Sequence, residues 1–435
     1  RKSQNLLFIG YCSTNTFHET YCLLVIVQQT HSTILSQAAA RLPYKSIQNI
    51  KSNMATLTKT LPKLVLHFDV NETILLVDDA GGDTFENCLN KTICKNSIVQ
   101  ANLFDSQQLP TTWCDGSLIS NNSTPPPLSS NFTLPSNTTS YYRAGGAAKT
   151  QAQTFTDTGS PGVGYQAIYN QLEQALRWPL NEDAPDPRLC KDGIHHFLLP
   201  AFFHTISELK KRNRTFAIVI RTFGTDVEDV ANALQAYADG AHLSRFTSVK
   251  EMTCKNVWDG RYNAKGAFQL TQRTTEKEKT TTTEETKTTE ETKTLILTPS
   301  PTPTTITNES DIISLLHGDR NTISCVACTD HYDWWKNHGY NPAAGKPVWL
   351  TKDDEEYLPI FFDDNIHNDS KDSIVAVRVR DDSTKEFSAL NGEETLEMQG
   401  RHVVRVPTFA PILNENWFLE QIDVCEKEFL RRREL

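Results

Sequence analysis

Three short apolar runs in this chain are each followed at once by polar side chains of a reactive type. The runs cover residues 64–68, 216–220 and 358–362. Runs of this length are typical of strands buried on both faces of a parallel sheet. Further strands are predicted at 373–379 and 403–406, and helices at 165–177, 199–211, 227–238 and from residue 416 onward. This alternation predicts an α/β fold in which a doubly wound parallel sheet is covered by helices.

The polar residues that end these runs form one candidate site. Asp69 and Asn71 follow the first run, Thr222 follows the second, and Asp363 and Asp364 follow the third. Ligands of open α/β sheets bind outside the carboxyl ends of the strands. We therefore expect these side chains to meet in one crevice.

The same residues resemble the motifs of the haloacid dehalogenase-like hydrolase superfamily. Its first motif, Asp-x-Asp-x-Thr after a strand, is matched at Asp69 and Thr73. Its second motif, a Thr or Ser that ends an apolar strand, is matched by Thr222, and its fourth, an acidic pair, by Asp363 and Asp364. The resemblance implies a Rossmannoid core with cap insertions.

The third motif of the superfamily is a lone lysine upstream of the acidic pair, and it is the least specific of the four. Lys346, between a glycine and a proline, is the preferred candidate. Lys336 and Lys352 are its competitors.

The resemblance also implies a reaction, in which Asp69 attacks the phosphorus of a small phosphorylated substrate and forms an aspartyl-phosphate. Thr222 and Lys346 would hold the transferring phosphoryl oxygens. Hard oxygen ligands suit Mg²⁺. They would come from Asp69, the backbone carbonyl of Asn71, and Asp363 or Asp364.

Asn71 departs from the superfamily pattern, because phosphatases of the family carry an aspartate there that protonates the leaving oxygen. An amide cannot carry that proton, and acid–base catalysis contributes roughly 10²- to 10⁴-fold. The sequence therefore predicts a slow phosphatase. The alternatives are a non-catalytic protein that binds a phosphorylated ligand and a dehalogenase-like hydrolase. The intact pair Asp363 and Asp364 favours metal-dependent phosphoryl chemistry.

The composition changes along the chain and predicts its organisation. Residues 1–53, before the first methionine, Met54, are interpreted as a non-native leader, with a transit or signal peptide as the alternative. The core is predicted at 54–78, 196–240 and 331–435, a cap at 79–195 with disorder at 121–140, and a second insertion at 241–330 with disorder at 271–307.

Charge and cysteine content limit the partners of the chain. With 43 Lys+Arg against 53 Asp+Glu, the net charge is −10, which disfavours nucleic acid. The longest apolar run, 21–27, is too short to cross a membrane. Ten cysteines at irregular spacing indicate reduced thiols, and Cys325 and Cys328 are interpreted as buried thiols rather than as zinc ligands. These features predict a cytoplasmic protein.

Overall fold

The structure, a computed structural model, describes the chain in two units, Arg1–Leu61 and Pro62–Leu435. In the first unit, strands β1 (Leu7–Cys12) and β2 (Cys22–Val27) pair antiparallel. In the second unit the described residues are 62–77, 82–254, 256–273, 303–371, 373–382 and 384–433. The rest of the predicted leader, Met54, and most of the predicted disordered segment 271–307 lie outside the described residues.

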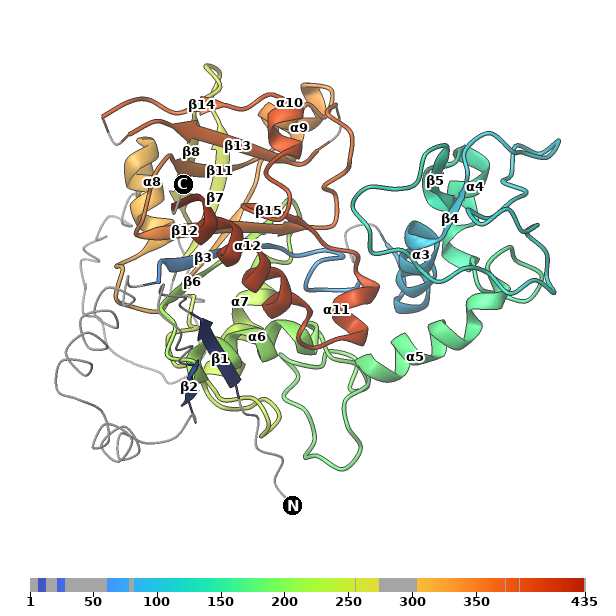
Figure 1. Cartoon of the computed structure of the whole chain (residues 1–435), viewed down its shortest axis with the longest axis horizontal. Coiled ribbons are helices and arrows are strands. Elements are labelled where there is room, and N and C mark those ends of the chain that lie inside the picture. The colour runs from blue at the N-terminus through green and yellow to red at the C-terminus, as the bar shows by residue number, and fades with distance from the viewer. Residues whose placement is uncertain are drawn as a thin grey trace, which may run out of the picture. The chain divides into compact units, whose positions relative to one another are not determined.

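An eight-stranded sheet organises the second unit (Figure 1). Its strand order is β15 (Val403–Arg405), β12 (Tyr357–Asp363), β3 (Lys63–Asp69), β6 (Phe216–Thr222), β10 (Ser324–Thr329), β7 (Val257–Tyr262), β8 (Phe268–Gln272) and β9 (Thr305–Ile306). The first six strands run parallel, and β8 pairs antiparallel with both neighbours. This mostly parallel sheet with helices confirms the predicted α/β class.

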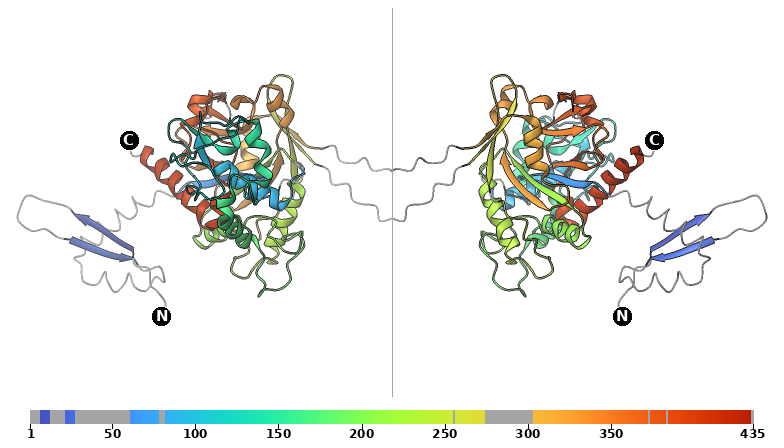
Figure 2. Two further views of the ribbon diagram at one scale, coloured as in Figure 1. Left: turned by 90° about the vertical axis from the view of Figure 1, so that its right-hand side faces the viewer. Right: turned by 90° about the vertical axis from the view of Figure 1, so that its left-hand side faces the viewer.

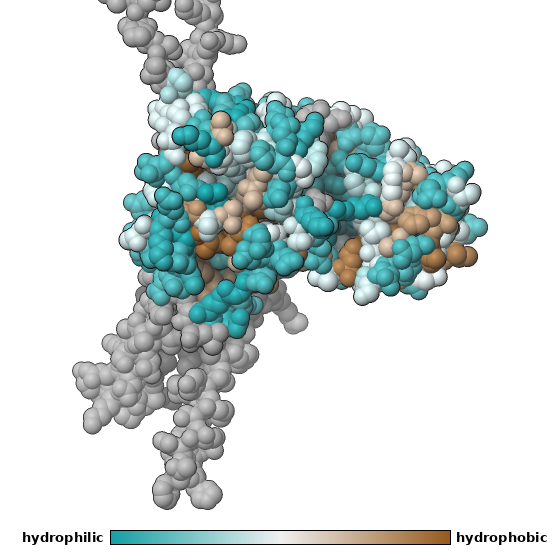
Figure 3. Space-filling view, turned by 90° about the horizontal axis from the view of Figure 1, so that it is seen from above, coloured by the Kyte–Doolittle hydropathy of each residue, from teal (hydrophilic) through white to brown (hydrophobic). Residues whose placement is uncertain are grey.

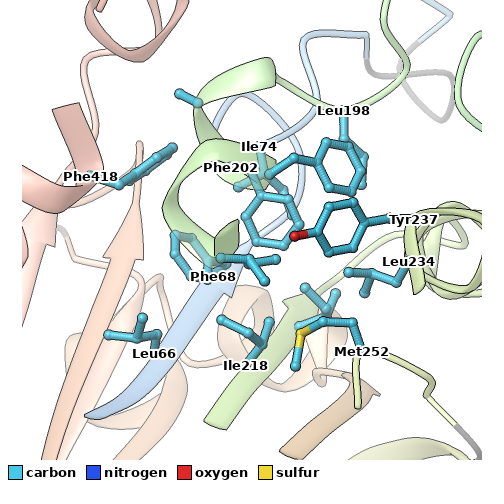
Figure 4. Close-up of a cluster of buried hydrophobic side chains, with 14 of the residues drawn as sticks. Leu66, Phe68, Ile74, Leu198, Phe202, Ile218, Leu234, Tyr237, Met252 and Phe418 are labelled. Carbon is cyan, nitrogen blue, oxygen red and sulfur yellow. The ribbon is translucent and has the colours of Figure 1, made fainter. Parts of the chain in front are cut away.

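One face of the sheet is covered by helices α6 (Pro200–Lys211), α7 (Val227–Ala238) and α12 (Trp417–Arg433). Figure 4 shows Leu66 and Phe68 of β3 pointing into this layer. Phe68 stacks on Phe362 at 4.9 Å between ring centroids and meets Phe202 and Phe418 edge-on. Helix α12, red in Figures 1 and 2, packs on α6 and β12.

Alternate residues of the same strands face the other way. Val65 of β3 and Val219 of β6 pack into a cluster with α8 (Glu309–His317). A smaller sheet of β11 (Lys346–Thr351), β13 (Val375–Arg380) and β14 (Ser388–Ala389) extends this layer. Because both faces are covered, the central strands are apolar on both sides, which is why they appear as continuous apolar runs in the sequence.

The chain between β3 and α6 builds a separate hydrophobic cluster around Trp113, Tyr141, Phe155 and Tyr165. Its elements are α3 (Phe85–Asn96), β4 (Ile98–Gln100), β5 (Thr138–Ser140), η2 (Tyr141–Arg143), α4 (Gly146–Thr150), η3 (Ala152–Thr154), η4 (Val163–Tyr165) and α5 (Gln166–Leu176). We call this segment, 82–176, the cap segment. The remaining elements of the unit are α9 (Tyr332–Asn337), η5 (Pro342–Ala344), α10 (Gly392–Leu396) and α11 (Phe409–Leu413).

Two predicted boundaries differ from the structure. Segment 121–140 is not free chain, because its Pro126 carbonyl accepts a hydrogen bond from the Tyr165 hydroxyl at 2.7 Å and β5 pairs with β4. Segment 241–330, assigned to an insertion, contributes β7, β8, β9 and β10 to the sheet. Strand β10 reads Ser-Cys-Val-Ala-Cys-Thr, too weakly apolar to stand out as a buried strand.

Figure 3 shows one face of the molecule, on which the coloured residues are mainly hydrophilic and apolar residues form smaller patches. Within the described residues, no helix combines the length and apolar character needed to cross a membrane.

The protein should lose stability as the pH falls below about 6.5, because two stacked histidines are buried uncharged. His196 and His242 lie 5.7 Å apart against Trp178, and burial lowers their pKa values to about 4 and about 3. A folded-state pKa below the unfolded value favours the neutral ring, so this contribution is complete above pH 6.5 and is lost on acidification. As the pH falls from 6.5 to 4, each histidine should lower the free energy of unfolding by about 1.4 kcal/mol per pH unit.

Urea unfolding at pH 7, 5.5 and 4.5 measures this slope. His196→Phe should flatten it, and the exposed control His338→Gln should leave it unchanged. Equal slopes for wild type and His196→Phe would contradict the assignment.

Candidate functional site

The candidate site lies at the carboxyl ends of three neighbouring parallel strands. Asp69 ends β3, Asp363 ends β12, and Thr222 ends β6. Strand β3 pairs with β12 on one side and with β6 on the other. The sheet therefore delivers all three residues to one edge, as the strand pattern predicted.

A buried lysine joins two of the acidic residues. Lys346 is 1% exposed, and its ammonium contacts Asp69 Oδ1 and lies 2.9 Å from Asp363 Oδ2. Burial disfavours this ammonium, but the carboxylates of Asp363 and Asp69 outweigh burial and raise its pKa. The competing candidates Lys336 and Lys352 are exposed. Among the three predicted lysines, Lys346 is the one that the structure brings to the acidic residues.

Asp364 completes a group of three buried carboxylates with Asp69 and Asp363, whose ligand oxygens all lie within 4.8 Å of one another. Burial and the neighbouring Asp363 raise the pKa of Asp69 well above its usual range. Burial also raises the pKa of Asp364 to about 7, against the opposing charge of Lys95. This excess of negative charge on oxygen donors, at a spacing that one ion can bridge, fits a hard divalent cation.

Thr73 fixes the loop that carries the first aspartate. Its hydroxyl donates to Asp69 Oδ2 at 3.2 Å and accepts from the Asp364 backbone N–H at 3.1 Å. Thr73 thus links the loop after β3 to the loop after β12, and both carboxylates keep their relative position.

Asn71 and Thr222 meet at Gly224. The Asn71 amide donates to Asp226 Oδ2 at 3.3 Å, and the Thr222 hydroxyl accepts from the Gly224 N–H at 2.8 Å. A Cβ on Gly224 would lie 2.5 Å from Asp226 Oδ2 and 3.3 Å from both Asn71 Nδ2 and Thr222 Oγ1, so a side chain at this position would displace Asp226. The Asn71 Oδ1 atom is buried and has no hydrogen-bond partner within the described structure.

A buried ion pair, which the sequence analysis did not identify, lies next to the backbone that carries Lys346. Arg221 and Asp330 are almost completely inaccessible, and the guanidinium donates to both carboxylate oxygens at 3.0 and 2.5 Å. Arg221 also donates to the Pro347 carbonyl at 2.9 Å, next to Lys346. The sequence signal for this pair was an arginine at the end of an apolar strand, because a buried guanidinium needs an acidic partner.

The cap segment contacts the site through charged residues of α3. Lys95 contacts Glu72 and lies 3.0 Å from Asp364 Oδ2, and Lys91 lies 2.8 Å from Glu72 Oε1. Glu72 has a left-handed backbone with φ of 60°, and its two lysines overcome burial and lower its pKa to about 2. The carboxylate is therefore ionised at neutral pH and does not replace the acid missing at Asn71.

A cleft of about 920 Å³ opens between these loops and the cap segment, with Asn71, Glu72 and Asp364 in its wall. No family model, curated protein or solved structure matches the chain. The site combines a buried carboxylate, an ammonium, a hydroxyl and oxygen atoms that could hold a metal ion, and such groups can perform phosphoryl transfer.

Two further predictions from the sequence concern cysteine. Cys328 is buried, with its thiol 3.6 Å from the Ile220 carbonyl, and the Cys325 thiol lies 2.8 Å from that of Cys254. His331 Nδ1 accepts a hydrogen bond from the Tyr262 N–H at 2.9 Å. His331 is therefore bound to the backbone of Tyr262. The Cys325 thiol contacts the Cys254 thiol and the Cys328 thiol contacts the Ile220 carbonyl, so the two cysteines point to different partners.

Asp330→Ala should destabilise the protein by about 3–5 kcal/mol, because it leaves the Arg221 guanidinium buried without its counter-charge. Equilibrium unfolding in guanidinium chloride measures this loss of stability. The matched control is Glu415→Ala, which removes a partly exposed partner of Arg245 at 2.7 Å and should cost about 1 kcal/mol or less. Equal losses in the two variants would refute the assigned role of the buried pair.

Proposed function

We propose that this protein is a Mg²⁺-dependent phosphoryl-transfer hydrolase that acts through an aspartyl-phosphate on Asp69. The observation that carries the proposal is the Lys346 ammonium in contact with Asp69 and Asp363 inside a buried group of three carboxylates. The strand order supports the likeness to the haloacid dehalogenase-like core, because β3 has β6 and then β10 on one side and β12 and then β15 on the other.

Each residue has a defined part in the proposed reaction. Asp69 is the nucleophile, and Lys346 and Thr222 bind the phosphoryl oxygens, which stabilises charge in the transition state without proton transfer. Mg²⁺ would be held by Asp69, the backbone carbonyl of Asn71, and Asp363 or Asp364. When bound, the ion would neutralise the anionic nucleophile and the phosphate. Burial and Asp363 raise the pKa of Asp69, and a bound Mg²⁺ would favour its ionised, nucleophilic form.

Asn71 limits the reaction that these groups can perform. Its amide donates to Asp226, so Asp226 holds the side chain in place while no proton is available to the leaving group. Esters with good leaving groups should therefore be the better substrates.

Turnover of p-nitrophenyl phosphate tests the proposal directly. The chain should hydrolyse this ester in Mg²⁺ and lose the activity in EDTA, and Asp69→Asn should reduce turnover by at least about 10³-fold because no covalent intermediate can form. Asp423→Asn, at an exposed position on α12, is the matched control. Binding of a phosphate analogue without turnover would favour a non-catalytic binder, and halide release from a 2-haloacid would favour a dehalogenase-like reaction.

Restoring a carboxylate at Asn71 tests the missing acid. Asn71→Asp should raise alkyl phosphate turnover by about 10-fold or more and aryl phosphate turnover by less, because phenolates leave without a proton. The new carboxylate would face Asp226 at the present 3.3 Å contact, so the single variant should also unfold at a lower temperature.

The double variant Asn71→Asp/Asp226→Asn exchanges the two groups and should recover the lost stability. It should keep the larger gain in turnover for alkyl than for aryl phosphates. Equal stimulation of both esters, with changed Mg²⁺ affinity, would mean that residue 71 acts on the metal rather than on the proton.

A further inference from the structure

The cleft beside the acidic group carries an excess of positive charge. Its wall includes five cationic side chains, Lys91, Lys95, Arg143, Lys149 and Arg405. Three acidic residues also line it, Glu72, Asp364 and Asp369. In a chain of net charge −10, this local excess of cations marks a place where an anion is attracted.

Four of the five cations fall into two pairs. Lys91 and Lys95 are paired with Glu72 and Asp364, so their charge is used to join α3 to the site. Within the described part of the chain, neither Lys149 nor Arg405 forms an ion pair: Lys149 lies 5.4 Å from the Tyr142 ring centroid, and the Arg405 guanidinium donates to the Asn131 carbonyl at 3.2 Å. Lys149 and Arg405 are therefore available to a ligand.

Arg405 gives the clearest sign of an absent partner. Its Nε atom is buried and has no hydrogen-bond partner among the described residues. Burial lowers the pKa of this guanidinium, against the favourable charge of Asp364. A buried donor that is left unpaired costs free energy, which an anion in the cleft would recover.

His367 lies near enough to three of the cleft cations for their charges to act on its ring. This cleft residue has its pKa lowered to about 3, first by burial and then by Arg143, Arg405 and Lys95. The ring is therefore neutral at pH 7, and three cationic side chains act on one position. Asp369, also in the wall, opposes them with a single charge.

We infer that this cleft binds a second anionic group of the substrate, so that the substrate class is a phosphate monoester bearing a further phosphate or carboxylate. The inference rests on the proposed function for the reacting phosphate, which would lie at Asp69. Lys149 and Arg405 would bind the second anion, and Arg143 would add its charge. The cleft volume of about 920 Å³ is sufficient for such a molecule.

Three esters of one chain length test the inference: butyl phosphate, butane-1,4-diol bisphosphate and 4-(phosphonooxy)butanoate. In the full-length protein with Mg²⁺, kcat/KM for at least one of the two analogues that carry a second anionic group should exceed that of butyl phosphate by about 10- to 100-fold. The better of the two identifies the second anion as phosphate or carboxylate.

The preference should depend on the cleft cations. Lys149→Gln, at an exposed position where folding is not at risk, should lower the preference ratio by about 3-fold, and Arg405→Gln by about 10-fold. Lys265→Gln, an exposed residue in the turn between β7 and β8, should leave the ratio unchanged. Equal kcat/KM for all three esters would overturn the inference while leaving the hydrolase proposal intact.

Binding to Asp69→Asn separates the two proposals. Titration calorimetry with the bisphosphate and butyl phosphate needs no turnover. Tighter bisphosphate binding that weakens in Asp69→Asn/Lys149→Gln supports the anion site even if no ester is hydrolysed, in which case the proposed function fails alone. Equal binding of both esters overturns the anion site.

Discussion

The contact of one buried ammonium with two buried carboxylates is the interaction on which the candidate site depends. Asp69, Asp363 and Asp364 lie together at the sheet edge, and without a positive charge they would repel one another strongly. Lys346 supplies that charge from β11, a strand of the smaller sheet. The three carboxylates can therefore lie together only because Lys346 lies beside them. Any reaction at Asp69 takes place next to this fixed cation.

The backbone around Lys346 is held by two close contacts. A Cβ on Gly345 would lie 2.0 Å from the Ile374 carbonyl, so the chain passes there only because residue 345 is a glycine. On the other side, Arg221 donates to the Pro347 carbonyl while its charge is balanced by Asp330. A buried pair of this kind adds little net stability but is costly to break. Its value here is to fix one lysine against two aspartates.

Charge compensation also explains how the cap segment meets the core. Glu72 adopts a left-handed backbone within the first motif and pairs with Lys91 and Lys95 of α3. Such a backbone is held only where its surroundings determine it. Lys95 also brings α3 to Asp364, so that the lysines of α3 meet acidic residues of the sheet edge in the cleft wall.

The sequence by itself determined the α/β class, the central strands β3, β6 and β12, and the polar residues at their carboxyl ends, because local apolar runs and the residues after them are visible without tertiary contacts. It also singled out Lys346. Only the tertiary structure decided that Asp330 partners Arg221, that Asp226 holds Asn71, and that β10 lies inside the sheet. These features join residues far apart in the chain, and burial and charge pairing between distant segments leave no periodic signal in a sequence.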